Sequence, residues 1–66
     1  MSVVKVVELM AESSKSWEDA TATAVKKASK SIDDITSVWV KDQSAVVKDG
    51  EVTGYRVSLK VSFKVK

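Results

Sequence analysis

The side chains that could carry out chemistry in this chain are ten serines, nine carboxylates and eleven lysines and arginines. Its 66 residues include neither histidine nor cysteine. A serine nucleophile therefore has no conventional activating base, zinc lacks its usual ligands, and no disulfide can form. No spacing of the acids singles out a pair for acid–base work, and the lysines occupy polar positions. We expect a protein that is not an enzyme.

Basic side chains line one face of the closing segment YRVSLKVSFKVK, residues 55–66. Side chains alternate across a strand, so the even positions carry Arg56, Lys60, Lys64 and Lys66 and the odd positions are apolar. This face could attract polyanions, but it lacks the aromatic residues on which single-stranded nucleic acids stack. Net charge is only +2. Lysines on an exposed strand also discourage unwanted edge pairing, and we favour that role over nucleic-acid binding.

The elements that position these side chains follow the order β-α-β-β in a single domain, residues 1–66. Apolar residues recur at helical spacing after Ser16, a suitable helix cap, and Asp49-Gly50 suits a tight hairpin turn. The expected elements are a strand at Val3–Met10, a helix from Trp17 to about Ser31, a strand at Ile35–Val47 and a closing strand at Tyr55–Lys66. The fold class is α+β, with a three-stranded antiparallel sheet.

The predicted helix is too short to cover the predicted sheet. The closing strand would be about 40 Å long, whereas the helix would be roughly 22 Å long. The first strand is also apolar on both faces. Apolar surface left exposed in this way usually meets another copy of the chain, so we expect a homo-oligomer. No membrane span or signal segment is visible, which predicts a cytoplasmic protein without a membrane partner.

Several short motifs in order resemble the dodecin family over essentially the whole chain. They are Val7-Glu8-Leu9, Ser16-Trp17-Glu18, Ala28-Ser29-Lys30 and the ending DGEVTGYRVSLKVSF, Asp49–Phe63. The resemblance implies a long antiparallel sheet curled around one helix and twelve copies assembled as a hollow homododecamer. It also implies a storage protein that sequesters flavin, either riboflavin or FMN.

The chain departs from the family at two flavin-binding positions. Flavin-binding members stack a strand-two Trp on the flavin ring and bond its polar edge with a Gln that follows the third-strand Tyr. These positions are Ser37 and Arg56 here, and Ser37 has no ring with which to stack. Trp39 lies on the same face as Ser37, about 7 Å along the strand, and could rebuild the stacking surface or fill a subunit interface. The predicted ligand-binding residues are Ser37, Trp39, Arg56 and Gln43.

The same two departures resemble a subgroup described as calcium dodecins. Calcium takes several oxygen ligands with carboxylates among them, and Asp42, Asp33 and Asp34 are the candidates. No calcium-loop motif is present, but Asp42 repeated around a symmetry axis could form a site between copies. We therefore interpret the chain as a dodecin-like small-ligand storage protein with a degenerate flavin site. The alternative is a calcium- or cation-binding shell without flavin.

Overall fold

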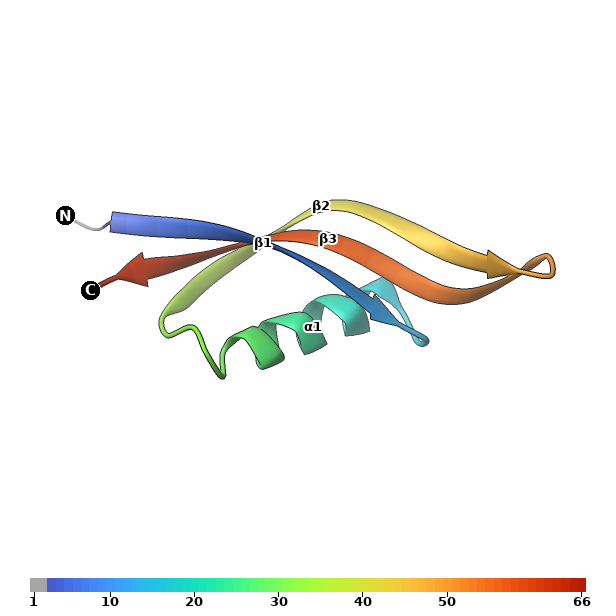
Figure 1. Ribbon diagram of the computed structural model, residues 1–66, viewed down its shortest axis with the longest axis horizontal. Coiled ribbons are helices and arrows are strands. Elements are labelled where there is room, and N and C mark those ends of the chain that lie inside the picture. The colour runs from blue at the N-terminus through green and yellow to red at the C-terminus, as the bar shows by residue number, and fades with distance from the viewer. Residues whose placement is uncertain (1–2) are drawn as a thin grey trace.

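The computed structural model describes residues 3–66 and shows one helix lying against a long, twisted three-stranded sheet (Figure 1). Strand order is β1-β3-β2, and both pairings are antiparallel. The elements in chain order are β1 (Val3–Ser13), α1 (Trp17–Ala28), β2 (Ile35–Lys48) and β3 (Glu51–Val65). The predicted element order and fold class are confirmed.

The boundaries differ from the prediction mainly where strand pairing extends an element. The first strand continues through the polar residues up to Ser13, which pairs with Tyr55, and β3 begins at Glu51. In contrast, α1 stops at Ala28, with Ser29 as its C-cap. Within the described residues, no helix is long and apolar enough to cross a membrane.

The strand register gives the sheet two unlike faces. On the helix face, β3 buries Val57, Leu59 and Val61, each at most 1% exposed. Because side chains alternate, the intervening residues lie on the face turned away from α1, which we call the open face. Cross-strand rows on this face are Glu8–Lys60–Trp39, Met10–Ser58–Asp42 and Glu12–Arg56–Ser44.

The helix is fixed at its first turn by specific polar contacts. Ser16 Oγ accepts the backbone N–H of Asp19 at 3.0 Å, as the predicted cap requires. Trp17 Nε1 donates to the Ser44 carbonyl at 2.9 Å, and its ring meets Tyr55 edge-on at 4.9 Å. Trp17 therefore packs against the core, as predicted, and ties α1 to β2 and β3.

Beyond the last β1 pair, β2 and β3 continue as a two-stranded hairpin arm, residues 46–54 (Figure 1). Asp49 and Gly50 form its turn with φ values of 53° and 77°. Both lie in the left-handed region that this tight turn requires, so the Asp-Gly prediction is confirmed. The arm projects past both β1 and α1.

The subunit exposes more surface than a compact chain of its mass. It measures 51 × 20 × 13 Å and exposes 4955 Å², whereas a folded monomer of 7.2 kDa would expose about 4,100 Å². The excess of roughly 800 Å² is what one partner contributes to a standard protein interface. Several large apolar side chains are more than half exposed: Val3, Val4, Val6, Met10, Trp39, Val47 and Val52.

We expect Leu59→Ala to lower the free energy of unfolding by about 2–5 kcal/mol, because it leaves a cavity in the small core. Urea unfolding followed by circular dichroism, at one protein concentration, measures this change. The exposed turn variant Lys48→Ala is the control, with a change within about 0.5 kcal/mol. Equal effects of the two variants would contradict this placement of the core.

Candidate functional site

Hydroxyl groups occupy the position where the resemblance places a stacking tryptophan. Ser37 Oγ is hydrogen-bonded to Ser62 Oγ across the β2–β3 pair, and Thr36 Oγ1 lies 3.3 Å from the same Ser62 oxygen. A register shift between Ile35 and Ser37 brings Thr36 and Ser37 to this one partner. The side chains here satisfy one another and provide no aromatic surface.

Arg56 occupies the second position that the resemblance assigns to flavin binding, and it forms an ion pair within the subunit. Arg56 Nε lies 2.6 Å from Glu12 Oε1, across the β1–β3 pair. The two side chains are about half exposed, so water screens the pair, yet its geometry directs the guanidinium toward β1. Arg56 is therefore engaged by Glu12 and lies one strand away from Ser37.

Trp39 is the large aromatic side chain of the open face, with 62% of its surface exposed. Lys60 Nζ lies 5.2 Å from the centroid of its ring, a cation–π distance. Ser37, Trp39 and Arg56 all lie on the open face, as predicted. Gln43 does not join them, because its register with Val57 places it on the helix face.

Glu8 and Glu12 of β1 partly neutralise the basic face that the closing segment shows when read alone, because they pair with Lys60 and Arg56. Glu8 Oε1 lies 3.6 Å from Lys41 Nζ and 4.0 Å from Lys60 Nζ, and Glu12 binds Arg56. Sequence reasoning missed these pairs because it read one strand at a time. The available signal was that Glu8 and Glu12 lie four residues apart on one face of β1. Antiparallel pairing places them opposite Lys60 and Arg56. This neutralisation weakens the polyanion alternative.

The three predicted metal ligands do not gather in one subunit. Asp42 lies on the open face in register with Ser58, and within residues 3–66 it makes no ion pair. Asp33 and Asp34 lie in the connection between α1 and β2. Among the described residues, no group of three or more acidic side chains could hold a metal ion. A multidentate carboxylate site on this chain therefore requires ligands from more than one copy.

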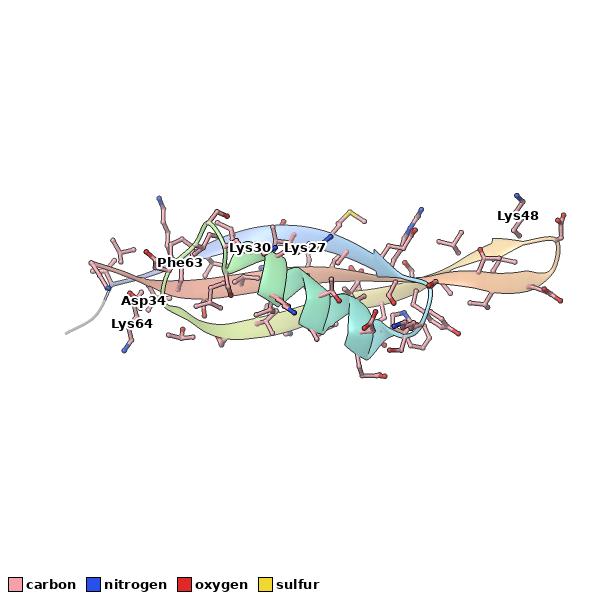
Figure 2. All side chains as sticks on the ribbon, turned by 90° about the horizontal axis from the view of Figure 1, so that it is seen from below. Lys27, Lys30, Asp34, Lys48, Phe63 and Lys64 are labelled. Carbon is pink, nitrogen blue, oxygen red and sulfur yellow. The ribbon has the colours of Figure 1, made fainter. Side chains whose placement is uncertain are left out.

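Asp34 lies at the end of the subunit opposite the hairpin arm, beside Phe63 and Lys64 (Figure 2). Its backbone has a φ of 60°, its carbonyl accepts the Lys64 N–H at 3.1 Å, and its Oδ2 lies 3.1 Å from Lys66 Nζ. The hydrogen bond and the charge of Asp34 raise the pKa of Lys66, with a smaller contribution from the charge of Asp33. Asp34 is thus already paired, which leaves it less free than Asp42 for a cation.

Comparison with known proteins identifies relatives that share this architecture. The family model named Dodecin matches residues 3–66. Calcium dodecin of Mycobacterium tuberculosis is 42% identical over 66 residues, covering all of this chain and 93% of the relative. Its crystal structure, described as having a novel calcium-binding site, superposes with a TM-score of 0.84 over 97% of this chain and 91% of that one. A variant of T. thermophilus dodecin, 29% identical, superposes with a TM-score of 0.93 over 100% and 98%.

Replacing Asp34 by Asn should return the pKa of Lys66 toward its ordinary value of 10.5, because the hydrogen-bonded carboxylate is lost. Because the pKa of Lys66 is higher in the folded state, its ion pair stabilises the fold fully when the pH is below the ordinary pKa. This stabilisation is lost as the pH rises through the folded-state pKa. The stability difference between the wild type and Asp34→Asn should therefore be present at neutral pH and shrink in strong alkali. NMR titration of the Lys66 side chain measures the shift. Asp33→Asn is the control, with a smaller change, and an equal change would contradict the assignment to Asp34.

Proposed function

This chain belongs to the dodecin family, and on that basis we propose that it is a homo-oligomeric binding protein whose ligand is calcium. The observation that carries the proposal is its 42% identity, over its whole length, to a relative named calcium dodecin. The flavin-binding positions support it, because Ser37 and Arg56 are engaged by Ser62 and Glu12. A binding role also agrees with a chain that lacks histidine and cysteine.

We propose that twelve copies form a hollow shell, as the family resemblance implies. The excess exposed surface of the single subunit supports association, since it matches the area that one partner gives to a standard interface. Exposed valines on β1 and at the hairpin arm, together with Trp39, provide the apolar contacts. Among residues 3–66, four apolar residues are fully buried, so further burial between copies would add stability.

We propose Asp42 as the calcium ligand, acting together with Asp42 of neighbouring copies. Its carboxylate is exposed on the open face, and no lysine or arginine among residues 3–66 forms an ion pair with it. Ser58, its cross-strand neighbour, adds a hydroxyl oxygen to the same row. Carboxylates brought together at a symmetry axis repel one another unless a cation lies between them, which favours calcium.

A second candidate is flavin stacked on Trp39, displaced by one pleat from the family position. The 62% exposure of the Trp39 ring on the open face favours it, because an exposed indole offers a stacking surface. Its polar partners would have to differ from those of the family, since Arg56 is bound by Glu12 and Gln43 lies on the other face. Calcium therefore remains the first proposal.

Calcium at a hundredfold excess over its dissociation constant should stabilise the assembled protein by about 2.7 kcal/mol per site, and a chelator should reverse this. Asp42→Asn should abolish the effect, because the amide lacks the charge that calcium requires. Thermal unfolding with calcium or with EGTA measures the shift in midpoint. Asp49→Asn is the matched control, because Asn also tolerates the left-handed backbone of the turn.

An unchanged midpoint in the wild-type protein, with calcium and with EGTA alike, would refute calcium binding. Retained stabilisation in Asp42→Asn together with its loss in Asp33→Asn would move the ion to the connection between α1 and β2. That result would overturn the assignment to Asp42 while keeping calcium as the ligand.

Riboflavin added in excess EDTA should keep its fluorescence, because the positions that stack and orient flavin are altered. A fluorescence titration at fixed protein concentration tests this. Quenching that saturates at a constant ratio to subunits, and that Trp39→Ala abolishes, would instead establish the second candidate. Trp17→Phe is the control, since Trp17 is anchored in the core and should leave the result unchanged.

A further inference from the structure

We propose that the hairpin arm, residues 46–54, docks in the groove between α1 and β2 of a second copy of this chain. The proposal rests on self-association, which forms part of the proposed function. It goes further by assigning one surface to one occupant. Arm and groove are different surfaces of the subunit, so each copy would donate its arm to one neighbour and receive the arm of another.

The arm carries two exposed valines, Val47 and Val52, beside the charged residues Lys48, Asp49 and Glu51 at its tip. It has only two strands, because the β1–β3 pairing ends at Ser13 and Tyr55. Val47 and Val52 face each other across it and are 63% and 52% exposed. An isolated two-stranded hairpin is marginally stable in water, yet β2 and β3 stay paired to Lys48 and Glu51. A packed neighbour would supply the missing burial.

The groove exists because α1 is placed off-centre on the sheet. The helix packs mainly over β1 and β3, so the helix-face residues of β2 are only partly covered. Val38 and Val40 form one wall, Ala22 and Val25 form the other, and Trp17 lies at one end. The groove is open to solvent, has a volume of about 580 Å³ and is lined mainly by apolar residues. Two valine side chains from an arm fit this chemistry.

The arm cannot fill the groove of its own subunit. Figure 2 shows the arm, marked by Lys48, leaving the end of the sheet away from α1, and the last β2 residue that lines the groove is Gln43, which precedes the arm. We assign a second copy as the occupant. The whole subunit exposes roughly 800 Å² more than a compact monomer of its mass, which is the area that one partner contributes to a standard interface. Head-to-tail contacts between unlike surfaces close into rings when the rotation between copies closes, which suits a symmetric assembly.

A competing groove lies on the other side of α1, against β1. It measures about 410 Å³ and is lined by Leu9, Ala20 and Ala24, with the charged groups Glu12 and Lys27 beside them. The valines of the arm, placed there, would have to desolvate these charges, one of which already binds Arg56. The groove against β2 has Glu18 as its one charged lining residue, so we assign the arm to it.

Disulfide trapping tests the assignment without background, because the natural chain has no cysteine. The test variant is Val52→Cys with Ala22→Cys, and the matched control is Val52→Cys with Thr23→Cys. Ala22 and Thr23 are adjacent exposed residues of α1, but Ala22 lines the groove against β2 and Thr23 lines the groove against β1. A disulfide forms only when the two Cα atoms approach within about 7 Å.

Mild oxidation of the assembled protein should link chains of the Ala22→Cys variant into multimers on a non-reducing denaturing gel. The Thr23→Cys variant should stay mainly as single chains. Multimers from the Thr23→Cys variant alone would place the arm in the other groove and overturn the proposal. No linkage in either variant, with the particle mass of the wild type retained, would overturn it while leaving self-association intact. If both variants and the wild type sediment as single chains, so that no linkage forms, self-association itself is refuted.

Discussion

The pairing of β3 with strands on both of its edges is the interaction on which the rest of the subunit depends. β1 and β2 each pair with β3 and not with one another, apart from an ion pair between Glu8 and Lys41, and the buried side chains of the core come largely from the helix face of β3. Because β3 runs from Glu51 to Val65 and α1 has only 12 residues, one helix covers part of one face. The uncovered face, the free strand edges and the projecting hairpin all follow from this mismatch in length. We propose that association with further copies completes the burial of a chain of this size.

On the open face, the two positions where the family resemblance places flavin contacts hold side chains that are paired within the subunit. A serine and an arginine occupy the flavin-binding positions of the family resemblance, and each has a partner in its own subunit. Ser37 bonds Ser62, and Arg56 binds Glu12. Glu8 of β1 also pairs with Lys41 of β2 and Lys60 of β3, so this part of the face presents paired charges beside the exposed indole of Trp39. Asp42 stands apart as a carboxylate for which the described residues provide no counterion. This arrangement favours a cation shared between copies over a planar organic ligand.

Strand alternation, helix spacing and turn chemistry made most of the fold predictable from the sequence. Ser16 as the cap, Trp17 in the core and Asp49-Gly50 at the turn were all readable from local preferences, and the structure confirms them. Cross-strand chemistry was not readable in this way, because it depends on register. The pairing of Glu12 with Arg56 and the separation of Gln43 from Trp39 both follow from which residues face each other across β3. The proposed calcium site could be predicted only as one shared between copies, because within the described part of one subunit no group of acids makes one.

The central claim is that this subunit is complete only as part of an assembly of identical copies. The most direct test is the particle mass from multi-angle light scattering at micromolar concentration, with circular dichroism on the same sample to show that the chains are folded. The account predicts a single species of many times 7.2 kDa, with twelve copies as the expected number. A folded species with the mass of one chain would contradict it, because the exposed valines and Trp39 would then be stable in water without a partner.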